Sequence, residues 1–301
     1  MSAKYVTFHD HAGWVVRDGP AFTAPLDSRF HAHRAAWLTS QLEASAFGTV
    51  QSYDGAGMSA GPMHWISVYP RDMTQGPLWK VLARIISSVP AAVAAPLVSR
   101  FEMKRWRLAE DGVLRWLAPG TAVSGEDIRI EFTGPHGKTP PSGPQYENAK
   151  QWALAYNAVF RNSATFQVQI DNAIRYLIQG HGDVELQVYR KYANLPSLDA
   201  VTAVPAHQLP PAIELAMCVY HAFTPNAPSE ALRILRSVPL TLSAEAFSKR
   251  LIRGLGTSHY GRWHDDPQDK GSRYDATRRV VWNHPGLWDR ALARSLMPKD
   301  L

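Results

Sequence analysis

The stretch DGAGMSAG at positions 54–61 decides how this sequence is interpreted, together with Glu43 eleven positions before it. Three glycines in eight residues favour a tight hairpin that leaves space beside its backbone. Asp54 opens the stretch, and Ser59 supplies a hydroxyl five positions later. Two carboxylates and a small hydroxyl are the groups with which a glycosidase protonates a leaving oxygen and directs water at a sugar. The segment therefore predicts a β-hairpin that carries catalytic groups.

The two acids are expected to differ in protonation. Glu43 lies at the end of a helix predicted over residues 29–44, where unpaired carbonyls disfavour another ionised carboxylate. Its apolar neighbours also favour the protonated form that a general acid needs. Asp54 precedes Gly-Ala-Gly, whose amides can donate hydrogen bonds, so it should stay ionised. We expect Glu43 to act as the acid, and Asp54 with Ser59 to hold the attacking water.

Residues 37–65 resemble segments of two groups of enzymes. The glycine-rich stretch is similar to the Asp-Gly-Arg-Gly-Tyr-Thr-Ala-Gly hairpin of family 46 chitosanases. Extended to His64, it also resembles the Thr-Ile-Gly-Ile-Gly-His hairpin of phage lysozymes. The segment that begins at Glu43 resembles the catalytic Glu-Ser-x-x-Phe-type segment of the lysozyme superfamily. The resemblance implies the general acid role for Glu43, the water-activating role for Asp54 and a water-holding role for Ser59, which replaces a threonine.

Further site residues follow from this resemblance. His64 matches the phage-lysozyme histidine that pairs with a carboxylate, and we expect its role to be structural. Substrate contacts are expected from Tyr53, Gly57 and Gly61. Gln167 is a further candidate sugar contact, although its position also fits an exposed helix face. No cofactor is expected.

The predicted fold class is α+β, mainly α. The resemblance implies a lysozyme-like, two-lobed fold in which a small antiparallel β-hairpin sheet lies beside the active-site cleft. We expect an irregular segment over residues 1–27, a lobe with the catalytic helix and hairpin over 28–135, and a helical lobe over 145–301. A loop rich in glycine and proline at 134–144 would be the hinge. Periodicity predicts further helices at 78–88, 147–160, 164–177, 184–192, 211–223, 229–238, 244–255 and 276–296, with the last broken at Pro285.

The β structure is expected in three places. Residues 47–68 should form a small antiparallel sheet, because short apolar pieces alternate there with turn residues. Residues 128–132 alternate like a strand. Residues 103–108 and 113–117 flank Glu110-Asp111-Gly112, which indicates a hairpin or a helix-turn.

The charge of the chain bears on the choice of polymer. Its formal net charge is +6, which favours polyanionic partners. No long basic run is present, so a nucleic-acid partner is not expected. Chitosan is polycationic, whereas peptidoglycan carries carboxylates. We therefore expect hydrolysis of the β-1,4 bond between N-acetylmuramic acid and N-acetylglucosamine, with inversion. The alternatives are a chitosanase, or a catalytically inactive lysozyme-like protein that binds glycan or builds a phage particle or cell envelope.

The N-terminal residues lack the pattern of a signal peptide, and no stretch has the length and apolarity of a membrane span. We expect synthesis in the cytoplasm without stable membrane insertion. The protein would act at the bacterial cell wall or periplasm after release, as an endolysin does, or be carried on a phage particle. The chain has one cysteine, Cys218, within an apolar run, which indicates a buried, inert thiol. No metal site is expected, because no group of histidines and acids has the spacing of a known metal-binding motif. The groups considered are His9 with Asp10 and His11, then His31 with His33, and then the histidines and aspartates of the polar loop at 259–269.

Overall fold

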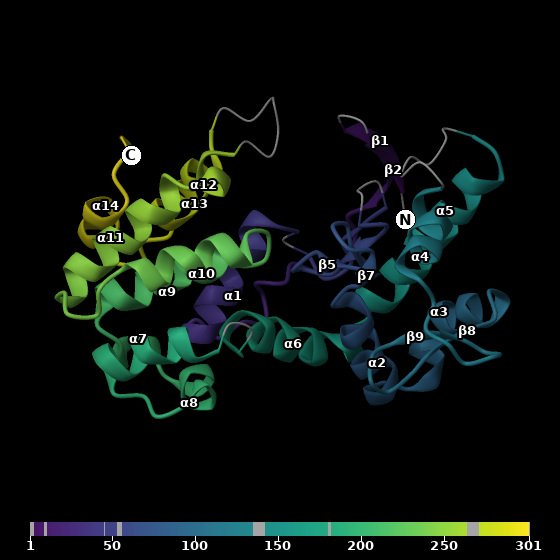
Figure 1. Ribbon diagram of the computed structural model, residues 1–301, viewed down its shortest axis with the longest axis horizontal. Helices are drawn as coiled ribbons and strands as arrows, with labels where there is room; N and C mark the ends of the chain where they lie inside the picture. Colours follow the sequence, from purple (N-terminus) through teal and green to yellow (C-terminus); the bar gives the residue numbers. More distant parts are fainter. Residues whose placement is uncertain are drawn as a thin grey trace. The chain divides into compact units, whose positions relative to one another are not determined.

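The structure, a computed structural model, describes residues 3–8, 11–44, 46–52, 56–134, 142–179, 182–263 and 271–300 (Figure 1). The chain divides into two units. Unit 1 comprises Met1–Ala24 and Glu43–Asn172, and unit 2 comprises Pro25–Leu42 and Ala173–Leu301. The protein is mainly helical with small antiparallel sheets, which confirms the predicted class at that level. Within the described ranges, no helix has the length and apolarity needed to cross a membrane.

An antiparallel sheet lies in unit 1 and confirms the sheet predicted over residues 47–68. Its strands follow one another in chain order: β1 (Lys4–Phe8), β2 (His11–Val16), β3 (Val50–Gln51), β4 (Ser59–Ala60) and β5 (Trp65–Ile66). The prediction that residues 1–27 are irregular is therefore wrong for β1 and β2. These strands form because β2 pairs with β3, Val16 opposite Val50. Trp14 also anchors β2 by donating its indole N–H to the Tyr146 carbonyl at 3.1 Å.

Helices and two hairpins complete unit 1. The helix α2 (Leu78–Ser88) has the predicted bounds. The prediction of a strand at 128–132 is wrong, because these residues belong to a helix, α4 (Gly125–Thr133). The Ser124 side chain caps this helix by accepting a hydrogen bond from the Asp127 N–H at 3.0 Å. The remaining elements are β6 (Val68–Tyr69), β7 (Thr74–Gln75), α3 (Ala91–Met103), β8 (Trp106–Leu108), β9 (Leu114–Trp116), α5 (Pro144–Phe160), η1 (Ser163–Thr165) and α6 (Phe166–Gln179), which continues into unit 2.

The core of unit 1 is aromatic. Trp152 on α5 meets Phe132 on α4 edge to face, with the ring centroids 5.2 Å apart. Phe47, which follows the candidate acid, stacks on Phe166 with centroids 3.8 Å apart. Such pairs stabilise beyond the area they bury. The segment between Glu43 and the hairpin is therefore held by packing on α5 and α6 of the same unit.

Unit 2 is built around α1 (His31–Leu42) and α9 (Pro211–Phe223), which pack against each other (Figure 1). The bounds of α9 are those predicted, and every side chain from Ala212 to Phe223 is buried. The other elements are α7 (Asp183–Ala193), α8 (Leu198–Ala203), η2 (Ala206–Gln208), α10 (Pro228–Ser237), α11 (Ala244–Gly256), α12 (His259–Arg262), α13 (Arg273–Trp282) and α14 (Arg290–Leu296). The break expected at Pro285 separates α13 from α14.

The two units differ from the expected lobes. We expected α1 in the first lobe, but it belongs to unit 2. The reason is that its buried residues, Ala32, Ala35 and Leu38 among them, need the apolar surface of α9. The second boundary lies between Asn172 and Ala173 instead of at 134–144. Residues 135–141 of that expected hinge lie outside the described residues.

Candidate functional site

Glu43 follows directly on the last residue of α1 and belongs to unit 1. Its side chain is 6% exposed, and its Oε2 lies 3.8 Å from Nδ1 of His64. The structure thus places the candidate acid in a covered position beside the histidine that follows the glycine-rich hairpin.

The His64 ring links Glu43 to the sheet. His64 Nε2 lies 3.2 Å from the side-chain nitrogen of Gln51 on β3. Because an amide nitrogen only donates, His64 accepts there and carries its proton on Nδ1, the nitrogen that faces Glu43. On the neighbouring strand β4, Ser59 pairs with Gln51 and is buried. Glu43 and His64 therefore lie close together, and Ser59 lies on the strand beside Gln51, which His64 contacts.

Asp54 and Tyr53 lie outside the described residues. The predicted water-activating role of Asp54 and the substrate contact of Tyr53 therefore stay predictions. The same holds for the separation between the carboxyls of Glu43 and Asp54, on which the predicted inversion depends.

Gly57 and Gly61 are held by packing within unit 1. Both have a φ of 78°, a conformation that favours glycine. A Cβ at Gly61 would lie 2.6 Å from the Trp65 ring and 2.9 Å from the Phe160 ring. A Cβ at Gly57 would lie 3.0 Å from the Ser67 hydroxyl. The protein's own side chains therefore explain the absence of side chains at both positions, whereas the predicted substrate contacts stay predictions.

Gln167 lies on an exposed face of α6. Its side-chain N–H donates to Asp171 Oδ1 at 2.9 Å, one helical turn further on. This is the arrangement that an exposed helix face produces. The hydrogen bond to Asp171 does not test the predicted sugar contact of Gln167, which stays a prediction.

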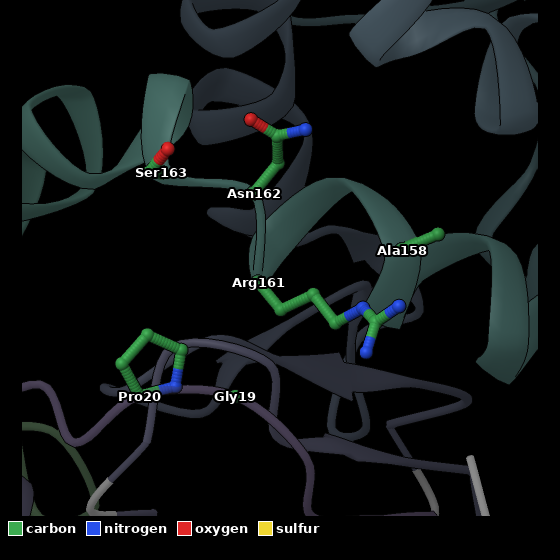
Figure 2. A pocket seen from close by; sticks show the side chains of 6 residues that line it. All are labelled: Gly19, Pro20, Ala158, Arg161, Asn162 and Ser163. Atoms are coloured by element: carbon green, nitrogen blue, oxygen red, sulfur yellow. The ribbon is translucent and has the colours of Figure 1, made fainter.

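A polar cavity of about 350 Å³ lies elsewhere in unit 1. Figure 2 shows the Arg161 side chain between the last turn of α5 and the segment Gly19–Pro20. Arg161 donates to Asp18 Oδ2 at 2.9 Å, so part of its charge is already paired. A guanidinium, an amide and a hydroxyl suit a ligand rich in oxygen atoms. The lining residues are Gly19, Pro20, Ala158, Arg161, Asn162 and Ser163.

A buried polar cluster in unit 2 is a group that the sequence interpretation missed. It brings together His31 on α1 with Glu214 and Cys218, one turn apart on α9. Glu214 Oε1 lies 3.4 Å from His31 Nδ1 and 3.2 Å from Cys218 Sγ, and the last two atoms are 3.6 Å apart. Burial, with the nearby Glu214 charge, raises the pKa of the Cys218 thiol well above its ordinary value. The prediction of a buried thiol is confirmed.

The same core contains a second buried acid, Glu185 on α7. Burial raises the pKa of its carboxyl to about 8, although the nearby Tyr220 hydroxyl acts in the opposite direction. Glu185 is therefore mostly protonated at neutral pH. The sequence signal for Glu214 was its place in the apolar helix α9, whereas Glu185 lies in a helix with several charged residues and had no such signal.

Function has to be argued from this geometry. No family model matches the chain, and neither the curated proteins nor the solved structures contain a match to it.

Proposed function

We propose that this chain is a peptidoglycan hydrolase with a lysozyme-like, two-lobed fold and with Glu43 as its general acid. The observation that carries the proposal is the 3.8 Å distance between Glu43 Oε2 and His64 Nδ1. It joins the residue that follows α1 to the hairpin, the two segments that the resemblance requires to meet at one site.

The reaction would be a single displacement. Glu43 gives its proton to the glycosidic oxygen while the bond from that oxygen to the anomeric carbon breaks. A water molecule, held by Asp54 and Ser59, forms the new bond to the anomeric carbon and gives its proton to Asp54. The Nδ1–H of His64 then faces the Glu43 carboxylate and stabilises its new charge. Inversion requires the two carboxyls to lie about 6.5–9.5 Å apart.

The site of action would be the bacterial cell wall, reached after release or on a phage particle. The net charge of +6 favours contact with an anionic wall. Chitosan, a polycation, is a less suitable substrate for this chain.

A second candidate function is a lysozyme-like protein that binds wall glycan, or builds a phage particle or cell envelope, without cleaving it. The low exposure of the Glu43 side chain, 6%, favours this alternative, because a general acid has to reach the glycosidic oxygen. The two functions share a glycan-binding surface and differ in turnover.

The experiment compares the full chain with Glu43→Gln on purified cell walls, by loss of turbidity and by mass analysis of the released muropeptides. Removing a general acid should lower the rate about 10²–10⁴-fold. Glu131→Gln is the matched control, because Glu131 is also a largely buried acid of unit 1, bound to Lys104 at 2.8 Å. It should keep activity per folded molecule.

The outcomes separate the candidates. An unchanged rate in Glu43→Gln, with wild-type lysis intact, would remove Glu43 from the mechanism. Wild-type protein that sediments with the walls but releases no muropeptide would favour the non-cleaving alternative. Products with a reducing glucosamine end would show a different bond specificity.

A further inference from the structure

The polar cluster of unit 2 is fully enclosed and is not part of the proposed hydrolase site. His31 is 0%, Glu214 3% and Cys218 0% exposed. A nucleophilic role for Cys218 is therefore excluded, because a substrate could not reach the sulfur. An imidazole, a thiol and a carboxylate with their ligand atoms within 4.8 Å of one another nevertheless form a donor set suited to a metal ion.

The spacing of the three atoms suits three of the four positions around one tetrahedral ion. Ligands bonded to zinc at about 2.0 Å for nitrogen or oxygen and about 2.3 Å for sulfur lie about 3.3–3.5 Å apart at tetrahedral angles. The observed distances are 3.4 Å from His31 Nδ1 to Glu214 Oε1, 3.2 Å from Glu214 Oε1 to Cys218 Sγ and 3.6 Å from Cys218 Sγ to His31 Nδ1. A nitrogen–oxygen hydrogen bond has a usual length of about 2.9 Å, so the pair of His31 and Glu214 is longer than hydrogen bonding alone would favour.

Neighbouring residues fix the orientation of the His31 ring and of the Glu214 carboxylate. His31 Nε2 lies 2.8 Å from the Tyr189 hydroxyl, which leaves Nδ1 directed at Glu214 and Cys218. Glu214 Oε2 accepts the indole N–H of Trp288 at 2.6 Å, which leaves Oε1 directed at the same point. Partners of this kind fix the ring and carboxylate of metal ligands.

We propose that His31 Nδ1, Glu214 Oε1 and Cys218 Sγ bind one zinc ion, and that this ion stabilises the fold of unit 2. Mixed nitrogen, oxygen and sulfur ligands suit zinc better than magnesium or calcium, which prefer oxygen alone. On uptake the Cys218 S–H bond is replaced by a sulfur–zinc bond, and the proton leaves to solvent. Zinc, thiolate and carboxylate then sum to zero charge.

Arg34 is a cation that the charge balance must include. Its NH1 lies 3.8 Å from Glu214 Oε2, the carboxylate oxygen that faces away from the proposed ion. Two backbone carbonyls, those of Ser28 and Leu287, also accept from its guanidinium. Arg34 therefore remains compatible with a bound ion.

Because the ligands are buried, the ion has to enter while unit 2 folds. The experiment refolds the full chain with one equivalent of Co²⁺ and records its absorption spectrum. The sequence has one cysteine, so a thiolate-to-cobalt charge-transfer band reports Cys218 and no other residue. We expect this band at one equivalent, its loss on adding excess zinc, and one zinc per chain after refolding with zinc.

Two variants and one stability measurement complete the test. Cys218→Ser should abolish the band, whereas His207→Gln, which changes an exposed histidine of the same unit, should keep it. Zinc present during refolding should raise the melting temperature of the wild type. Wild-type protein that folds without a charge-transfer band, or that binds cobalt through its histidines only, would overturn the proposal. The wild-type spectrum decides this even if a variant fails to fold.

Discussion

Replacing Gly61 with alanine should destabilise unit 1 strongly. The new Cβ would lie 2.6 Å from the Trp65 ring and 2.9 Å from the Phe160 ring, and all three residues belong to a packed core. The φ of 78° adds backbone strain of about 1–2 kcal/mol for a residue with a Cβ. Overpacking of this kind costs about 1–3 kcal/mol. Together these give an expected loss of about 2–5 kcal/mol in the free energy of unfolding.

Gly120→Ala is the matched control. Gly120 has a φ of 89°, but the described residues place no atom within 4 Å of the position that a Cβ would take there. The variant should cost the strain alone, about 1–2 kcal/mol. The assay is urea unfolding followed by tryptophan fluorescence and far-ultraviolet circular dichroism. Equal losses in the two variants would refute the packing argument. Full stability of Gly61→Ala together with lost wall lysis would show instead that Gly61 is needed for substrate, as the sequence predicted.

Two further predictions concern stability. Glu185 has a folded-state pKa of about 8, above its ordinary value of 4.5. Between these pH values the native state therefore holds a proton that the unfolded state has lost. The free energy of unfolding should fall as the pH rises from about 4.5 to 8. Glu185→Gln should flatten this part of a melting-temperature profile, and parallel profiles for the two proteins would contradict the reasoning. Gln75 joins two segments by donating to the Leu114 and Val123 carbonyls and accepting from the Leu114 N–H, each at 2.8 Å. Gln75→Ala should therefore cost about 2–4 kcal/mol in urea unfolding, whereas the exposed Gln167→Ala should cost little; similar losses in both would contradict it.

Local patterns predicted several helices well. The bounds of α2 and α9 follow from apolar periodicity and from the prolines that precede each helix. Residues 128–132 were misread because isoleucine and phenylalanine alternate there as in a strand. The cap at Ser124 and the acids Glu126 and Asp127 in the first turn favour a helix instead.

Contacts between distant residues could not be predicted in the same way. The strand β2 exists because it pairs with β3, and the partner of α1 is α9, far along the chain. The candidate site was found because Glu43, Ser59 and His64 lie within one short stretch. The buried cluster was not found, because His31 and Cys218 are 187 positions apart and no local signal relates them.

The course of the chain between the two units has a practical consequence. Residues 25–42 belong to unit 2, but they are encoded inside unit 1. A fragment made by cutting before Ala173 would lose α1 and leave the apolar surface of α9 open to water, so it should aggregate. A fragment that joins residues 25–42 through a linker to position 173 would contain all of unit 2. Any attempt to assign activities to separate parts of this protein should therefore use such a rearranged chain.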